Sequence, residues 1–282
     1  MEFIHTSRPS PIAGTWYSGD PDRLKKEINQ YIDSAVISTD EYSGRLFGIV
    51  VPHAGLIYSG KTAGYAYRLT KGIERDIVVV LSPFHQYHPA GILTTAFQAY
   101  TTPLGKVPVA TDLLSALQEK LLDVDLPIEQ VEQDPEHALE IQLPFLQCTL
   151  QGDYSLLPLM IRTRNPQQVK TIAAYLTEIL DGYSALWVAS TDLSHFNPLE
   201  EAQQLDAEML RRIKAMDAEG VLSADREGNA SACGASAVAA LLYAAKHRQD
   251  GRSNILNYRT SADTTGDAHS VVGYGAAAVL TQ

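Results

Sequence analysis

The sequence has few cysteines and no excess of positive charge. Its 282 residues include only two cysteines, Cys148 and Cys233. This is too few for a disulfide framework and is typical of a reducing compartment. Lys and Arg number 22 against 33 Asp and Glu, which gives a net charge of −11. Because nucleic acids and anionic membranes attract clusters of basic residues, this balance argues against both as partners.

Long hydrophobic runs and targeting patterns are also missing. No apolar stretch approaches the length that spans a bilayer, and the first twenty residues lack the basic region and apolar core of a secretory signal. We find no low-complexity tract, no repeat at a fixed period and no linker of distinct composition. We therefore expect a cytoplasmic protein in which residues 1–282 form a single domain.

Several common catalytic motifs are absent. The sequence has no HExxH metal motif, no paired CxxC, no GxxxxGKS/T or GxGxxG phosphate-binding loop and no GxSxG nucleophile turn. Any active site must therefore be assembled from residues that are dispersed along the chain.

Short apolar runs rich in β-branched residues predict a sheet that is buried on both faces. These runs cover residues 46–51, 76–82, 154–161, 185–190 and 270–280, and further, antiparallel strands are expected at 92–95 and 254–260. Helices are predicted where Asp or Asn precedes a proline, at Pro21, Pro135, Pro166 and Pro198. Pro144 should kink or end the second of these helices. The pattern predicts an α/β fold with helices on both sides of a mixed, mostly parallel sheet.

Three histidines and an aspartate follow the predicted strands directly. His53 in PHAGLIYSG follows 46–51, His85 in LSPFH follows 76–82, and Asp192 and His195 in STDLSHF follow 185–190. A lone histidine at a strand end is usually a hydrogen-bonded loop residue. However, ligands of open α/β sheets bind beyond the carboxyl ends of the strands. The joint placement therefore favours a site, and the spacing favours neighbouring strands for His53 and His85.

Cys233 is a candidate ligand because it precedes a strongly helical segment. The positive end of a helix dipole favours thiolate, although a cysteine among alanines often packs as a small hydrophobe. Imidazole and thiolate suit iron, copper or zinc. Two histidines with one anionic ligand leave positions open for oxygen or substrate.

The segment DPEHALEIQLPF has two interpretations. Glu136, His137 and Glu140 lie within one turn of a predicted helix and could form a metal or proton-relay edge of the pocket. An acidic first turn is equally what the helix dipole favours. Tyr58, in the same stretch as His53, is a further candidate for lining the pocket.

Seven segments, in order, resemble those that define the Memo family: RPSPIAGTWY, PHAGLIYSG, LSPFH, DPEHALEIQLPF, STDLSHF, CGASAVAAL and TSADTTGDAHSVVGYGAAAVL. Together they span nearly the whole chain. The resemblance implies the fold of class III extradiol ring-cleaving dioxygenases, a three-layer α/β/α sandwich. Those enzymes hold iron(II) with two histidines and a glutamate and use another histidine as acid/base. In Memo proteins a cysteine stands in place of the glutamate.

Carried over to this chain, the resemblance assigns His53, His85 and Cys233 as metal ligands and His195 as the acid/base residue, with Asp192 orienting His195 or lining the pocket. It implies one transition-metal ion, with iron(II) favoured and copper or zinc as alternatives. In prokaryotes it also implies a radical-SAM system as a partner. A thiolate in place of a carboxylate alters the metal's potential and invites thiol oxidation, which argues against ordinary catechol cleavage.

We therefore expect a metalloprotein that performs redox or oxygen chemistry on an unidentified small molecule or peptide. One alternative is a metal-free Cys-His hydrolase with Cys233 as nucleophile, His195 as base and Asp192 as the orienting acid. That scheme leaves His53 and His85 without a role. A second alternative is a non-catalytic module whose pocket binds a peptide or protein.

Overall fold

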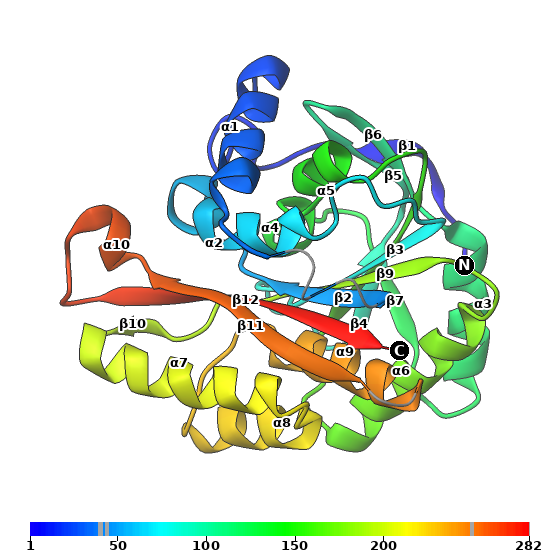
Figure 1. The fold of residues 1–282 in the computed structure, drawn as a ribbon. Coiled ribbons are helices and arrows are strands. Elements are labelled where there is room, and N and C mark those ends of the chain that lie inside the picture. Colours follow the sequence, from blue (N-terminus) through cyan, green and yellow to red (C-terminus); the bar gives the residue numbers. More distant parts are fainter. Residues whose placement is uncertain (39–41, 43–44, 249–250, 282) are drawn as a thin grey trace.

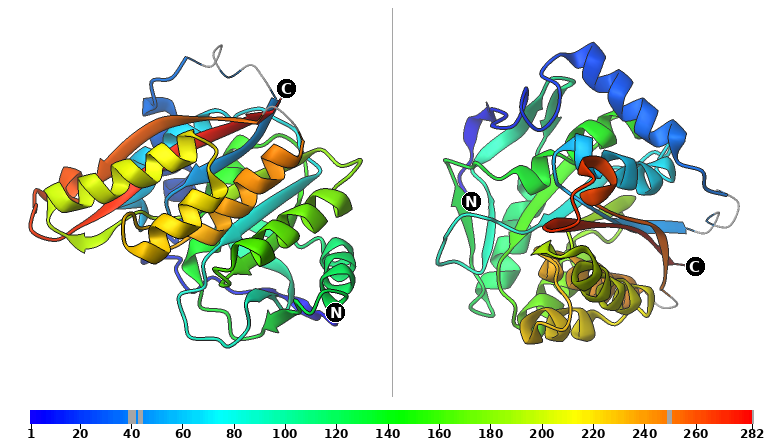
Figure 2. Two further views of the ribbon diagram at one scale, coloured as in Figure 1. Left: turned by 90° about the horizontal axis from the view of Figure 1, so that it is seen from below. Right: turned by 90° about the vertical axis from the view of Figure 1, so that its left-hand side faces the viewer.

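A computed structural model of the chain describes residues 1–38, 42, 45–248 and 251–281. A nine-stranded mixed sheet forms its middle layer, and helices cover both faces of the sheet (Figures 1 and 2). In spatial order the strands are β10 (His195–Asn197), β12 (Val271–Thr281), β2 (Arg45–Val51), β9 (Ala185–Ser190), β3 (Ile77–Ser82), β8 (Ser155–Ile161), β4 (Ile92–Thr95) and β7 (Ile128–Val131), with β11 (Arg252–Thr260) paired to β12.

The helices divide into two layers, which lie above and below the sheet in Figure 1. The upper layer contains α1 (Pro21–Ser34), α2 (Leu56–Arg68), α4 (His137–Glu140) and α5 (Leu143–Thr149). The lower layer contains α3 (Thr111–Leu122), α6 (Pro166–Ile179), α7 (Leu199–Lys214), α8 (Ala218–Glu227) and α9 (Ala235–His247). The short α10 (Ala262–Thr265) lies in the turn between β11 and β12. This arrangement confirms the predicted α/β sandwich.

Four central strands run parallel, in the order β2-β9-β3-β8, and antiparallel neighbours flank them at β12 and β4. Every residue of β3 is buried, as expected of a strand covered on both faces. Because the four strands share one direction, the loops that follow β2, β9 and β3 emerge at the same edge of the sheet. That edge is where the sequence placed the candidate site.

The prediction that His53 and His85 follow neighbouring strands was wrong. Their strands, β2 and β3, are not neighbours, because β9 pairs with both of them. The loop after β9, which carries Asp192, therefore lies between the two histidine loops. The common strand direction still brings both histidines to one edge.

Two of the four helix starts are confirmed. The Asp20 side chain accepts from the backbone N of Arg23, and the Asn165 side chain caps the helix that begins at Pro166. The start expected at Pro135 was wrong, because Glu136 is the residue that caps α4. The start expected at Pro198 is displaced by one residue to Leu199. Asn197, the expected capping residue, belongs to β10 and pairs with Val271 of β12.

The proline expected to end a helix does so. The helix α4 ends at Glu140, and α5 begins at Leu143 with Pro144 in its first turn. A second, three-stranded sheet was not predicted: β1 (Ile4–Arg8), β5 (Phe97–Thr102) and β6 (Gly105–Pro108) pair in the order β1-β5-β6. Its strand β1 lies at the amino-terminal end of the chain and brings Arg8 beneath the candidate site.

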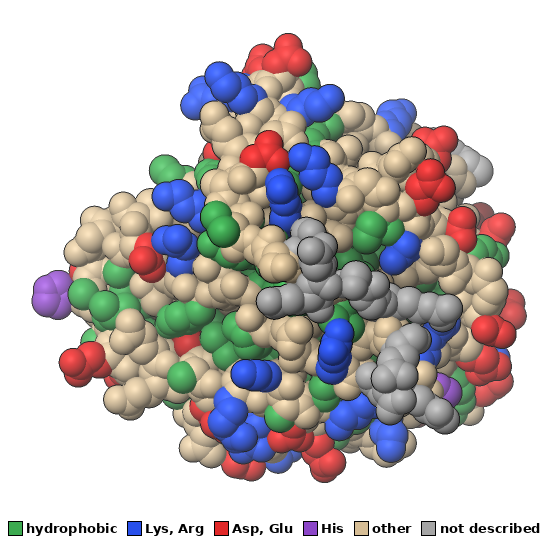
Figure 3. All heavy atoms as spheres, in the orientation of Figure 1, with side chains coloured by type: hydrophobic (Ala, Val, Ile, Leu, Met, Phe, Trp, Pro, Cys, Tyr) green, Lys and Arg blue, Asp and Glu red, His purple; other side chains and the backbone are tan. Residues whose placement is uncertain are grey.

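Charged side chains are unevenly distributed over the surface. In the view of Figure 3, acidic side chains gather along the right-hand margin, whereas Lys and Arg side chains are spread across the middle of the face. Among the described residues, no helix has the length and hydrophobicity that a membrane-spanning segment requires.

Replacing Gly64 with alanine tests the packing of the upper helix layer. A Cβ at Gly64 on α2 would lie 2.4 Å from the carbonyl oxygen of Tyr31 on α1. We expect Gly64→Ala to lower the free energy of unfolding by about 1–3 kcal/mol, measured by urea denaturation, because the two helices must separate.

Gly19→Ala is the matched control. A Cβ there would have its nearest neighbour at 3.5 Å, which is ordinary contact. Its effect should stay within about 0.5 kcal/mol. Equal stability of the two variants would contradict the close packing of α1 on α2.

Candidate metal centre

Three histidines cluster at the carboxyl edge of the sheet. His53 follows β2, His85 follows β3, and His137 opens α4. One ligand atom from each lies within 4.8 Å of the other two. The ring centroids of His85 and His137 are 4.6 Å apart, and the His53 ring is 5.3 Å and 5.5 Å from them. The structure thus joins His137, which the sequence left between two interpretations, to the two strand-end histidines.

The hydrogen bonds of Ser190 fix the tautomer of His53. Ser190 Oγ donates to the carbonyl of Ala138 at 2.6 Å and accepts from Gln142 Nε2 at 2.9 Å. Its only proton is therefore committed, so His53 Nδ1, at 2.9 Å, must be the donor to Ser190 Oγ. This leaves the lone pair of His53 on Nε2. Burial lowers the pKa of His53 to about 3, so the ring is neutral near pH 7.

Glu136 orients the ring of His85, as Ser190 does for His53. Its carboxylate accepts from the backbone N of His85 at 2.6 Å, from His85 Nδ1 at 2.9 Å and from the backbone N of Ala138 at 2.8 Å. Burial opposes the ionised form, but the bonds from His85 prevail and hold the pKa of Glu136 at about 2. Because an ionised carboxylate only accepts, His85 Nδ1 donates, which places the lone pair of the neutral ring on Nε2. Burial opposes the charged ring, but the hydrogen bond and the charge of Glu136 raise the pKa of His85, so a metal ion would displace the proton from Nε2 where the ring is charged.

His137 completes the cluster from the other side of Glu136. Its Nδ1 lies 3.4 Å from Glu136 Oε1, and its ring lies against Trp16 with centroids 4.1 Å apart. Burial lowers the pKa of His137 to about 4. Trp16 was not identified from the sequence, where nothing distinguished it from other aromatic residues.

The segment that carries Glu136 is held from below by a buried cation. Arg8 on β1, 1% exposed, donates to Asp134 Oδ2 at 2.6 Å, to the carbonyl of Glu136 at 2.6 Å and to the carboxylate of Glu140. Tyr17 also donates to Glu140, at 2.6 Å. Glu140, a candidate for the pocket, therefore directs its carboxylate to this network, and its contacts support the segment that places Glu136 and His137.

Cys233 contacts the cluster at His53. Its Sγ lies 3.2 Å from His53 Nε2 and accepts from the backbone N of Asp192 at 3.2 Å. Gly234 permits this approach, since a Cβ there would lie 2.3 Å from the carbonyl oxygen of Ser190. Burial, with a further contribution from Asp192, raises the pKa of the Cys233 thiol, which outweighs the expected effect of the helix start. A metal ion would displace the thiol proton.

Asp192 is bound to His53 and not to His195. Its Oδ1 accepts from the backbone N of His53 at 2.7 Å, and its Oδ2 lies 4.0 Å from His53 Nε2. Within the described ranges, no hydrogen bond joins Asp192 to His195. His195 on β10 is half-buried and close enough to interact electrostatically with His53 and Asp192. Tyr58, in the first turn of α2, is 40% exposed.

The donor set fits a transition-metal ion. Two imidazoles direct Nδ1 to Ser190 and Glu136, which leaves Nε2 of each ring as the atom that would bind a metal, and a third imidazole lies beside them. Metal-bound histidines in proteins commonly donate their other ring nitrogen to a carboxylate or another oxygen acceptor, as His53 and His85 do. Two sets of three ligands are therefore candidates, and they differ in the third residue. His137 clusters with both His53 and His85, whereas Cys233 forms a hydrogen bond to His53.

This chain is similar to known proteins over nearly its whole length. The family model described as "Memo-like protein" matches residues 8–278. A MEMO1 family protein of Methanosarcina barkeri is 30% identical over 271 residues, covering 95% of this chain and 98% of that protein. One of Thermoplasma acidophilum is 32% identical over 275 residues, covering 95% and 96%. An uncharacterized protein of Escherichia coli K12 has a similar structure, with a TM-score of 0.52 at 14% identity over 82% of this chain and 98% of that chain. This last likeness concerns the fold alone.

Removing Arg8 should destabilise the protein strongly. In Arg8→Met, the carboxylates of Asp134 and Glu140 would stay buried without their cation. We expect the free energy of unfolding, from urea denaturation, to fall by about 3–5 kcal/mol.

Arg226→Met provides the comparison, since Arg226 and its partner Glu227 are both more than half exposed. The free energy of unfolding of Arg226→Met should fall by at most about 1 kcal/mol. A loss below about 1 kcal/mol for Arg8→Met would contradict the role of Arg8 in holding this segment.

Proposed function

This chain belongs to the Memo family, and from that premise we propose that it is a cytoplasmic metalloprotein with one transition-metal ion at the histidine cluster. The observation that carries the proposal is that ligand atoms of His53, His85 and His137 lie within 4.8 Å of one another. The fixed tautomers of His53 and His85 support it. The two cysteines, which suit a reducing compartment, support the proposed location.

His53 and His85 belong to both ligand sets that we consider. The geometry of the cluster supports His137 as the third ligand, and the family resemblance supports Cys233. Iron(II) remains the favoured ion, with copper or zinc as alternatives. A thiolate would shift the preference toward the softer ions, because soft ligands select soft metals.

A bound transition-metal ion would supply redox and Lewis-acid chemistry toward oxygen or a substrate. The residues of the chain would prepare the site for it. Ser190 and Glu136 hold the two imidazoles in the metal-binding tautomer. His195, half-buried at the margin of the cluster, would hold and transfer a proton to a substrate. Asp192 would position the His53 loop through its bond to the backbone N of His53.

One contact favours a second function, a metal-free Cys-His hydrolase. The 3.2 Å separation of Cys233 Sγ and His53 Nε2 is that of a nucleophile and its base. In this hydrolase His53 would act as the base, the role that the sequence analysis assigned to His195. The raised pKa of Cys233 argues against it, because the nucleophile must be a thiolate. A non-catalytic module that binds a peptide or protein is the third alternative.

We propose a small molecule or peptide as the substrate and a radical-SAM system as the partner, both of which rest on the family resemblance alone. The decisive experiment for the function itself is elemental analysis of protein purified without oxygen or chelator. It is followed by titration with Fe(II), Cu(I) and Zn(II). One ion per chain supports the metalloprotein.

Alanine variants should identify the ligands. We expect His53→Ala and His85→Ala each to weaken metal binding sharply, because the loss of one ligand leaves too few for a stable site. His137→Ala and Cys233→Ala distinguish the two ligand sets, since only the true third ligand should behave like His53. Affinity is measured by titration against a chelator of known strength.

His247→Ala is the control. This histidine ends α9, is exposed and lies outside the cluster, so its removal should leave the affinity unchanged. Wild-type affinity in both His53→Ala and His85→Ala would refute the metal centre.

His195→Gln separates proton transfer from metal binding. Glutamine keeps size and polarity but cannot titrate near neutral pH. We expect full metal content and a loss of oxygen consumption or turnover of about a hundred- to ten-thousandfold. Loss of metal would make His195 a ligand, and unaltered turnover would exclude it from the mechanism.

A further inference from the structure

A cavity lies at the opposite edge of the sheet from the histidines. Its volume is about 770 Å³, within the range of small-molecule sites. Its walls come from the start of β2 (Leu46, Phe47), the residues that precede β3 and β9, and Thr281 at the end of β12. Strands of six or seven residues separate this amino edge from the carboxyl edge, roughly 20 Å at about 3.3 Å per residue. The cavity is therefore distinct from the candidate metal centre.

The cavity is lined by cations in an acidic protein. Arg68, Lys71, Arg75 and Arg248 all contribute to its wall, and no carboxylate does so among the described residues. The chain as a whole carries a charge of −11. A hollow lined by one sign of charge concentrates ligands of the opposite sign.

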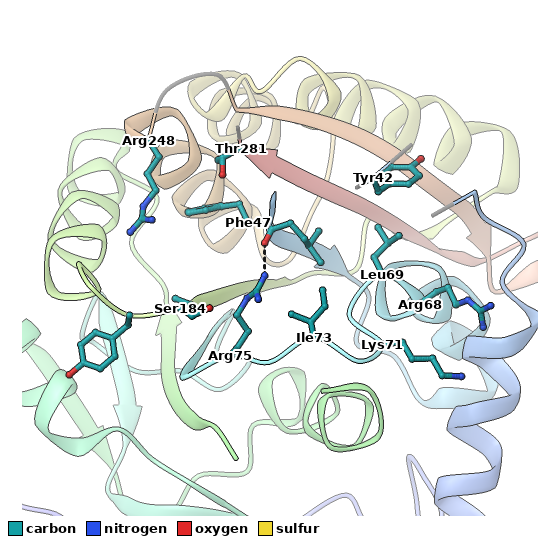
Figure 4. Close-up of a pocket in the computed structure, with 13 residues that line it drawn as sticks. Tyr42, Phe47, Arg68, Leu69, Lys71, Ile73, Arg75, Ser184, Arg248 and Thr281 are labelled. Carbon is teal, nitrogen blue, oxygen red and sulfur yellow. Dashed lines mark hydrogen bonds between the residues drawn. The ribbon is translucent and has the colours of Figure 1, made fainter. Parts of the chain in front are cut away.

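Two of the cations make no ion pair with an acidic side chain among the described residues. Arg75 donates to the carbonyl oxygens of Glu74 at 2.8 Å and Leu46 at 3.2 Å, and its buried Nε has no hydrogen-bond partner among the described residues. Burial lowers the pKa of Arg75, and the charge of the neighbouring Asp76, which makes no ion pair with it, only partly opposes this shift. Arg248 makes no side-chain ion pair within the part of the chain that the structure describes. Figure 4 shows Arg75 in the middle of the cavity and Arg248 entering from the end of α9.

The other two cations share one carboxylate. Arg68 and Lys71 both lie 3.0 Å from Asp33 Oδ1 on α1, and Figure 4 shows both side chains reaching toward that helix. The positive charge of the cavity is therefore only partly neutralised. Between the cations the wall is apolar, with Phe47, Leu69 and Ile73.

From the two arginines that form no ion pair among the described residues, the buried Nε of Arg75 and this apolar wall, we propose that the cavity binds a phosphorylated organic anion that carries a planar ring, of the nucleoside phosphate class. Several spaced N–H donors suit the oxygens of a phosphate dianion. The apolar wall suits the ring, as in small-molecule sites that combine apolar walls with a few polar groups. The proposal is independent of the metal centre.

Calorimetric titration of the full chain tests the proposal with adenosine monophosphate, inorganic phosphate and adenosine as probes. We expect saturable binding of one adenosine monophosphate per chain, weaker binding of phosphate and weakest binding of adenosine. Arg75→Gln should weaken adenosine monophosphate roughly ten- to a hundredfold, since it removes charge-assisted hydrogen bonds. Asp33→Asn should strengthen it, because Arg68 and Lys71 lose their competing carboxylate.

Three controls make the outcome specific. Arg226→Gln removes an equal charge from an exposed position on α8 and should leave the affinity unchanged. His85→Ala should also leave it unchanged, which separates this cavity from the histidine cluster. In wild-type protein, the side-chain Nε–H resonance of Arg75 should shift on titration, a readout that needs no variant to fold.

The proposal fails if neither phosphate compound binds saturably, or if adenosine binds as tightly as adenosine monophosphate. It also fails if Arg226→Gln weakens binding as much as Arg75→Gln. Loss of binding in His85→Ala with retention in Arg75→Gln would place the ligand at the histidines and overturn it as well. Equal affinity for adenosine monophosphate and inorganic phosphate would overturn the role of the apolar wall.

Discussion

The carboxylate of Glu136 is the contact on which the histidine cluster depends. It accepts from both the backbone and the ring of His85, caps α4 through Ala138 and lies against His137. One buried group therefore sets the tautomer of one imidazole and the position of another. Because the pKa of Glu136 is held at about 2, the carboxylate is ionised near neutral pH, and these contacts persist across the physiological range.

Glu136 keeps its place because the chain beneath it is held by buried ionic bonds. Arg8, from the amino-terminal strand, links Asp134, Glu140 and the carbonyl of Glu136. A buried cation with several acceptors in good geometry resists displacement, since any shift would leave charges without partners. The small three-stranded sheet therefore supports the site, because its strand β1 positions Arg8 against the segment that carries Glu136.

The main sheet separates two regions of opposite chemical character. At its carboxyl edge, burial keeps His53 and His137 neutral, with pKa values lowered to about 3 and about 4, which suits metal binding. At its amino edge, Arg75 and Arg248 face a cavity without a carboxylate in its described lining. The same strands, β2, β9 and β3, connect the two edges, so the metal centre and the anion site that we propose lie at opposite ends of one set of strands.

The layered fold, and the edge of the sheet where the site lies, could be predicted from local sequence patterns. Near-continuous apolar strands such as 76–82 require cover on both faces, and residues that follow parallel strands must share an edge. His53 and His85 could be chosen on that basis, because local pattern fixes strand ends. Only the tertiary structure decided which groups surround them. It inserted β9 between β2 and β3, bonded Asp192 to His53 rather than to His195, and brought His137, Trp16 and Arg8 to the cluster. These contacts join residues far apart in the chain, and their geometry depends on how whole elements pack, which no local spacing encodes.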